Sequence, residues 1–137
     1  MTVFVDTSAL YALLDRADAN HKHAVVAWAG LLDSDERFLT SNYVLVESFA
    51  LTQSRLGMDA VRLLQEDILP VVMIHLVDRE IHRSSVSALL SAARRNLSLV
   101  DCVSFEIMRT LGVNTAFTFD PHFKEQGFTV IPSSIDS

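Results

Sequence analysis

The chain begins with a short apolar run that ends in an acid, and this feature restricts the possible folds most strongly. Val3, Phe4 and Val5 are consecutive apolar residues, which is typical of a strand buried on both faces. Asp6 follows directly, and the apolar residues within 9–14 then favour a helix. A carboxylate at the point where a buried strand passes into a helix lies where open α/β sheets place their ligand sites. We therefore expect Asp6 to belong to a functional site.

Strand and helix signals alternate along the rest of the chain. Further strands are expected at residues 37–40, 71–74, 115–119 and 128–131, and further helices at 24–32, 43–55, 58–69, 78–93 and 98–111. This alternation is typical of a parallel sheet with helices on both faces, so the predicted fold class is α/β. Because no repeat, low-complexity segment or linker is found, residues 1–137 are expected to form a single domain, with a loosely held tail after Pro132.

The composition limits the classes of function. Half of the 137 residues are hydrophobic and 20% are charged, which argues against disorder. The formal net charge of -6 argues against a broad basic surface for nucleic acid, although a metal ion in an acidic pocket reverses the local charge. Cys102 is the only cysteine, so an internal disulfide is excluded. The sequence shows no secretory signal and no apolar stretch near the roughly 20 residues that span a bilayer. We expect a cytoplasmic protein without a membrane partner.

Four acids are candidates for the chemistry. Asp6 and Asp120 follow predicted strands, while Glu47 and Asp101 lie within two turns of a predicted helix start. These ends of the strands and helices converge on one crevice of a parallel sheet, so we expect the four carboxylates to meet. Crowded carboxylates repel one another and ionise fully only when a hard cation neutralises them. Oxygen ligands suit Mg²⁺ or Mn²⁺ rather than Zn²⁺, and such an ion can activate water and stabilise the charge of a phosphodiester during cleavage.

Three of these acids also have a plainer interpretation as helix caps. Asp6 is a preferred N-cap residue. Asp101 comes three residues after Ser98, which fits a capping box with Asp in place of Glu. Asp120 directly precedes Pro121, and Asp followed by Pro is a common helix start. Each acid taken singly fits a cap well, so only the set of acids argues for a site.

Glu47 is harder to explain as a structural residue. Helical spacing places it on one face with Val44 and Leu51, among apolar neighbours. An isolated buried carboxylate is costly unless it is paired, hydrogen-bonded or bound to metal. We therefore expect Glu47 to be buried in the site, and the alternative is that it faces water through a gap in the apolar surface.

Four segments, in this order, resemble the motifs of PIN-domain ribonucleases, and specifically of the VapC toxins of bacterial toxin–antitoxin pairs. They are residues 4–10 around Asp6, residues 40–47 ending in Glu47, residues 97–108 around Asp101, and residues 116–128 around Asp120. The resemblance covers nearly the whole chain. It implies a PIN-like three-layer α/β/α fold with a five-stranded parallel sheet.

The resemblance also implies an activity and a site. The activity would be that of a Mg²⁺-dependent endoribonuclease, with Mn²⁺ as the alternative ion. Asp6, Glu47, Asp101 and Asp120 would be the catalytic and metal-binding residues, with Asp6 and Asp101 as the direct metal ligands. Thr7 and Thr118 would supply supporting hydrogen bonds. The implied partners are an RNA substrate, a cognate antitoxin laid across the active-site groove, and a second copy of the chain in a homodimer.

Two other classes of function compete with this hypothesis. A phosphatase or phosphotransferase would use Asp6 as a covalent nucleophile, but that chemistry usually needs a second acid two residues later, where Ser8 stands, and a nearby lysine. A non-catalytic PIN-like module that binds RNA or protein would use its acids only as caps. It predicts an exposed Glu47 and acids that do not converge.

Two groups of basic residues are further candidates for the site. His21 and His23 lie near a predicted helix start, and we interpret them as a solvated surface rather than as ligands. Arg94 and Arg95 form the most basic spot near the Asp101 segment. They fit either phosphate positioning or a solvated helix end, and the sequence leaves both open.

Overall fold

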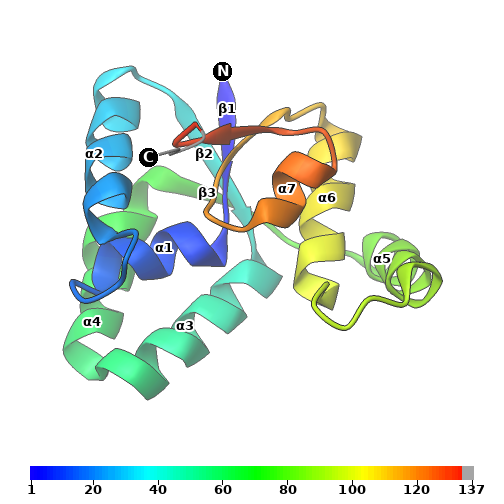
Figure 1. The fold of residues 1–137 in the computed structure, drawn as a ribbon, viewed down its shortest axis with the longest axis horizontal. Coiled ribbons are helices and arrows are strands. Elements are labelled where there is room, and N and C mark those ends of the chain that lie inside the picture. Colours follow the sequence, from blue (N-terminus) through cyan, green and yellow to red (C-terminus); the bar gives the residue numbers. More distant parts are fainter. Residues whose placement is uncertain (134–137) are drawn as a thin grey trace.

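A sheet of five parallel strands forms the centre of the computed structural model, which describes residues 1–133 (Figure 1). The strands are β1 (Thr2–Val5), β2 (Arg37–Ser41), β3 (Val72–His75), β4 (Thr115–Phe117) and β5 (Thr129–Ile131). Their order in the sheet is β3-β2-β1-β4-β5, and every neighbouring pair is parallel. The predicted five-stranded parallel sheet is confirmed. The expectation of a loose tail concerns mainly residues 134–137, which lie outside the described part of the chain.

Helices cover both faces of this sheet, which confirms the three-layer α/β/α architecture. They are α1 (Thr7–Leu14), α2 (His21–Asp33), α3 (Asn42–Leu56), α4 (Met58–Leu63), α5 (Arg79–Ala92), α6 (Leu99–Leu111) and α7 (Pro121–Glu125). In Figure 1, α1 to α4 lie on one side of the sheet and α5 to α7 on the other. Right-handed crossovers explain this division, because the chain passes from β1 to β3 in one direction and reaches β4 and β5 in the opposite direction.

The predicted helix at residues 58–69 differs from the structure. The α-helix ends at Leu63 and continues as a π-helical turn, Leu64–Ile68, and a 3₁₀ turn, Leu69–Val71. Pro70 explains why the α-helix does not continue, because proline has no backbone N–H to donate within a helix and its ring clashes with the carbonyl group four residues earlier. The wider turn still buries Leu64 and Ile68 in the core.

The strand order creates a crevice beside β1. The chain leaves β1 toward β2 on one side, and β4 is hydrogen-bonded to β1 on the other side. In open α/β sheets, ligands bind at this reversal of strand order, outside the carboxyl ends of the strands. Phe4, Phe117 and Phe123 are fully buried and fix β1, β4 and α7 around the crevice. The segments that leave β1 and β4 here carry Asp6 and Asp120.

Candidate metal centre

All four candidate acids line one hollow at the carboxyl edge of the sheet. Asp6, Glu47, Asp101 and Asp120 share a cavity of about 320 Å³. They come from the end of β1, the β4–α7 loop, the second turn of α3 and the first turn of α6, segments that are far apart in the sequence. The structure therefore brings the four residues together, whereas their catalytic and metal-binding roles stay a prediction.

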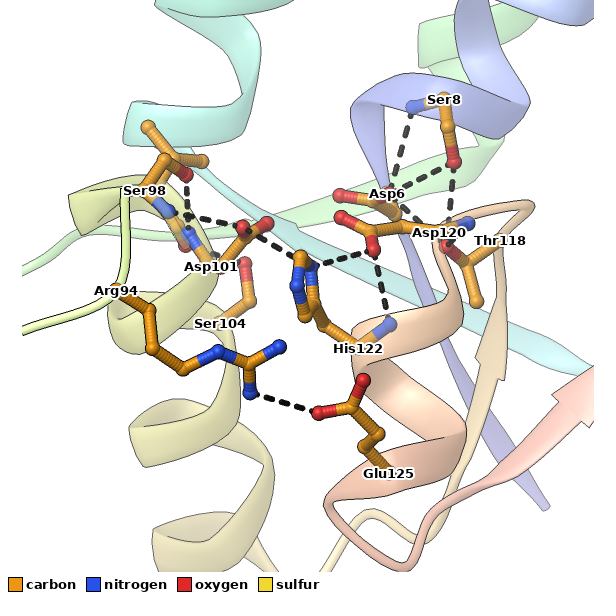
Figure 2. A network of polar contacts seen from close by, with 11 residues as sticks. Asp6, Ser8, Arg94, Ser98, Asp101, Ser104, Thr118, Asp120, His122 and Glu125 are labelled. Atoms are coloured by element: carbon orange, nitrogen blue, oxygen red, sulfur yellow. Dashed lines mark hydrogen bonds and ion pairs between the residues drawn. The ribbon is translucent and has the colours of Figure 1, made fainter. Parts of the chain in front are cut away.

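Asp6 is buried at the point where β1 passes into α1. Its Oδ2 atom accepts hydrogen bonds from Ser8 Oγ at 2.8 Å, Thr118 Oγ1 at 2.9 Å and the Ser8 backbone N–H at 3.4 Å. Burial raises the pKa of Asp6 to about 6, and the charges of Asp101 and Asp120 add to this rise, while the bonds from Ser8 and Thr118 oppose it. Figure 2 shows the other carboxylate oxygen on the side that faces Asp101. This oxygen has no hydrogen-bond donor within residues 1–133.

Two hydroxyl groups fix the distance between Asp6 and the β4–α7 loop. Thr118 Oγ1 donates to Asp6 and accepts from the Asp120 N–H at 2.9 Å. Ser8 Oγ likewise donates to Asp6 and accepts from the Phe119 N–H at 2.9 Å. These bonds draw the loop away from the sheet, so β4 ends at Phe117 and not at residue 119 as predicted. The supporting bond expected from Thr118 is confirmed, and Ser8 is a second support that the sequence analysis missed.

Asp101 combines a capping box with a place in the hollow. Its backbone N–H donates to Ser98 Oγ at 3.0 Å, and its Oδ2 accepts from the Ser98 N–H at 3.1 Å. Only 8% of the residue is exposed. Burial raises the pKa of Asp101 to about 6, and the nearby charge of Asp120 adds to the rise, while the Ser98 bonds and His122 oppose it.

The helix-cap interpretation of Asp6, Asp101 and Asp120 is also confirmed. Asp6 and Asp120 are the N-caps of α1 and α7, and Asp120 accepts the His122 N–H at 2.9 Å. Asp101 completes the capping box of α6, whose N-cap is Ser98. Each cap, however, uses one carboxylate oxygen and leaves the second without a donor within residues 1–133. A cap therefore orients each carboxylate and leaves an oxygen for a cation, so the structural and the metal-binding roles are compatible.

His122 is a residue of the site that the sequence analysis did not select. Its Nδ1 atom lies 2.8 Å from Asp120 Oδ1 and 3.9 Å from Asp101 Oδ2 (Figure 2). The residue is buried, and one ligand atom each from Asp101, Asp120 and His122 lie within 4.8 Å of one another. The signal was its position two residues after Asp120, because the first turn of a helix folds back toward its N-cap.

Glu47 corrects the expectation drawn from helical spacing. The residue is exposed, so the prediction of a buried carboxylate is wrong. The buried stripe of α3 runs instead through Val44, Ser48 and Thr52, and Ser48 Oγ donates to Thr7 Oγ1 at 3.3 Å. Glu47 therefore stands on the rim of the hollow. Thr7 supports α3 and not the acids, in contrast to its predicted role.

The donor set has the chemistry of a divalent-cation site. Carboxylate oxygens are the ligands that Mg²⁺ and Mn²⁺ prefer, and an imidazole nitrogen is acceptable to Mn²⁺. The raised pKa values of Asp6 and Asp101 reflect burial and mutual repulsion, which a bound cation would relieve. The nearby Arg94 is already paired with Glu125, at 2.8 Å. Within residues 1–133, the helices are too short or too polar to cross a membrane.

Comparisons with known proteins agree with this geometry. A profile of the PIN domain matches residues 3–128. The 23S rRNA-specific endonuclease VapC20 of Mycobacterium tuberculosis H37Rv is 33% identical over 130 residues, which cover 94% of this chain and 97% of the relative. The crystal structure of VapC20, described as a sarcin–ricin loop cleaving toxin, matches with a TM-score of 0.82 over 93% of this chain and 96% of that chain.

Two more distant structures share the fold. FitAcB from Neisseria gonorrhoeae is 16% identical, with a TM-score of 0.68 over 95% of this chain and 96% of that chain. VapBC2 from Rickettsia felis, solved with a DNA fragment of its promoter, is 11% identical, with a TM-score of 0.70 over 95% and 97%. With the family profile and the 33% identical relative taken together, this chain is a member of the PIN-domain family, of the VapC type.

Proposed function

We propose that this protein is a Mg²⁺-dependent endoribonuclease that hydrolyses RNA phosphodiester bonds, and that it is the toxin of a VapBC-type pair. One observation carries the proposal: four acids from distant segments line one hollow at the reversal of strand order. The alternative interaction module predicts an exposed Glu47, which is found, and dispersed acids, which are not. The competing phosphatase hypothesis needs a lysine near the nucleophile, and none of the described residues that line the hollow is a lysine.

The residues of the hollow have distinct tasks in this proposal. Asp6 and Asp101 hold the cation directly, and Asp120 and Glu47 complete the catalytic set. A divalent cation in this place supplies activation of water and neutralisation of phosphate charge. Ser8 and Thr118 keep the free oxygen of Asp6 turned toward Asp101 by occupying the other one. Mg²⁺ is the proposed ion because most of the available donors are carboxylate oxygens, and Mn²⁺ is the alternative.

The proposed partners follow from the relatives. VapC20 is described as cleaving 23S rRNA at the sarcin–ricin loop, so a ribosomal RNA loop is the first substrate to test. A cognate antitoxin and a homodimer also belong to the proposal. An apolar hollow of about 320 Å³ beside Glu47, lined by Tyr43, Val46 and Val100, is a surface that a protein partner would cover, because Val46 is 70% exposed.

The test is cleavage of a panel of structured and unstructured RNAs, including a sarcin–ricin loop, with Mg²⁺, with Mn²⁺ and with chelator. We expect cleavage that needs the metal and is lost in Asp101→Asn. Asp33→Asn is the matched control, because Asp33 is an exposed aspartate outside the hollow. Cleavage that persists in chelator, or that is equal in both variants, would refute the proposal.

Metal binding has a separate readout that needs no substrate. A ligand that binds only the folded state stabilises it by about 2.7 kcal/mol at a hundred times its dissociation constant. We therefore expect Mg²⁺ and Mn²⁺ to raise the melting temperature of the wild type and of Asp33→Asn. The melting temperature of Asp101→Asn should respond little at the same concentrations. An equal response in all three proteins would mean that the cation binds elsewhere.

A further inference from the structure

A third hollow adjoins the acidic one. It has a volume of about 420 Å³ and shares Asp120 with the acidic hollow. Its walls come from the start of α2, the β4–α7 loop and α7, and they include Asn20, His23, Phe119 and Lys124. A volume of this size lies within the range of small-molecule binding pockets and suits about one nucleotide.

The distribution of basic side chains distinguishes this hollow from the other two. Among residues 1–133, no lysine, arginine or histidine lines the acidic or the apolar hollow. The third hollow contains Lys124 and His23. Because the protein carries a net charge of -6, a phosphate chain that approaches the acids needs a cationic contact close by.

Lys124 and His23 are available for such a contact. The neighbour of Lys124 on α7, Glu125, is engaged by Arg94, whereas no carboxylate lies within ion-pair distance of Lys124 in the part of the chain that the structure describes. His23 is exposed. His21, in contrast, is half-buried, and its Nδ1 lies 2.7 Å from the Ala12 carbonyl oxygen, so the expectation that both histidines are solvated is wrong for His21.

Phe119 adds an aromatic surface to the same hollow. Its ring is partly buried and packs edge-on against Phe117, with 6.3 Å between the ring centroids. Its backbone N–H is fixed by Ser8 Oγ. A ring held in this way loses little freedom when a base stacks on it, and an aromatic ring beside cationic side chains is a recurrent feature of single-stranded RNA sites.

We propose that the hollow formed by Asn20, His23, Phe119 and Lys124 binds the RNA strand next to the bond that is cleaved. Lys124 and His23 contact a phosphate, Phe119 stacks on the adjoining base, and the scissile phosphate then lies at Asp120, in the acidic hollow. This inference rests on the proposed nuclease function and adds to it the binding site for the neighbouring nucleotide.

The experiment measures RNA binding without cleavage. The parent protein is Asp6→Asn, and the probe is a fluorescein-labelled single-stranded RNA of mixed sequence, followed by fluorescence anisotropy over a series of salt concentrations. Lys124→Ala should weaken binding about tenfold and reduce the salt slope by about 0.7, the value for one phosphate contact on a single strand. Phe119→Leu should weaken binding about tenfold with an unchanged slope, because stacking is not ionic. His23→Ala should weaken it less.

Lys22→Ala is the matched control, because Lys22 is an exposed lysine beside His23 that does not line the hollow. It changes the net charge as Lys124→Ala does. If the two lysine variants bind equally, the inference is wrong even when the wild type cleaves RNA. If the parent protein does not bind RNA and the wild type shows no metal-dependent cleavage, the proposed function and the inference fail together.

Discussion

The two ends of α1 each carry an aspartate, and the two carboxylates lie in opposite environments. Asp6 caps the N-terminus inside the acidic hollow, and burial raises its pKa to about 6. Asp15 follows the C-terminus near the surface, where it accepts hydrogen bonds from Tyr11 Oη at 2.7 Å and from the Ala17 N–H at 2.9 Å. These two bonds lower the pKa of Asp15.

The comparison shows that the ionised carboxylate of Asp6 destabilises the fold, whereas that of Asp15 does not. Asp6 also accepts hydrogen bonds, from Ser8 and Thr118, but burial and the charges of Asp101 and Asp120 outweigh them. Asp15 has donors, solvent and no such neighbours. A charge kept where the fold destabilises it is typical of a functional site, whereas a charge satisfied by local donors is typical of a structural one.

The largest expected effect separates the two aspartates by activity. We expect Asp6→Asn to lower RNA cleavage by about 10³-fold, because the amide loses the charge that holds the cation. Asp15→Asn should cleave at nearly the wild-type rate. Initial rates on the same RNA, at a saturating concentration of Mg²⁺, measure both variants. If Asp6→Asn and Asp15→Asn lose similar fractions of the cleavage rate, Asp6 has no special role in catalysis.

The next effect concerns stability in the absence of metal. The pKa of Asp6 is about 6 in the folded protein and 3.8 in the reference state, so the folded state binds the proton more tightly. The free energy of unfolding should therefore fall as the pH rises from about 4 to 6, by up to about 3 kcal/mol from this group. Asp6→Asn should lack this loss and be more stable than the wild type at pH 7.

For Asp15, the free energy of unfolding should change with pH in the opposite direction. Its pKa is lowered in the folded protein, so its contribution to stability is present above the unfolded pKa and is lost as the pH falls through the folded value. Urea unfolding of the wild type, Asp6→Asn and Asp15→Asn with chelator at pH 2, 3, 4, 5, 6 and 7 tests both signs, because the Asp15 effect lies below the unfolded pKa of 3.8 and the Asp6 effect lies above it. A wild type and an Asp6→Asn variant that differ equally at pH 4 and pH 7 would show that the Asp6 charge carries no cost.

The parts of this site that the sequence could predict are those with local signals. Asp6 and Asp120 were placed correctly because a strand end and a helix cap are both visible within a few residues. The parallel sheet then brings them to one edge without any further information. The hydrogen bond of Thr118 to Asp6 depends on the register between β1 and β4, so only the family resemblance predicts it. The bond of Ser8 to Asp6 is local, two residues along the chain, and the sequence analysis missed it.

Glu47 shows where an apolar pattern misleads. The face of α3 that packs on the protein carries Ser48 and Thr52, which are almost fully buried although they are polar. An assignment from hydrophobic residues alone rotates the helix, which moves Glu47 inward and Ser48 outward. The partner of Ser48 is Thr7, 41 residues earlier, so the sequence near α3 holds no sign of this contact.

The smallest expected effect tests whether surface acids near the site behave like Asp15. Glu125 is paired with Arg94 at 2.8 Å, and this hydrogen bond lowers the pKa of Glu125. Because both side chains are exposed, Glu125→Gln should leave the unfolding transition nearly unchanged. The pair nevertheless joins the loop before α6 to α7, whose N-cap is Asp120 (Figure 2). If Glu125→Gln lowers the cleavage rate without changing stability, the Arg94–Glu125 pair positions Asp120. A hydrogen-bonded acid at the surface would then contribute to the site, in contrast to Asp15.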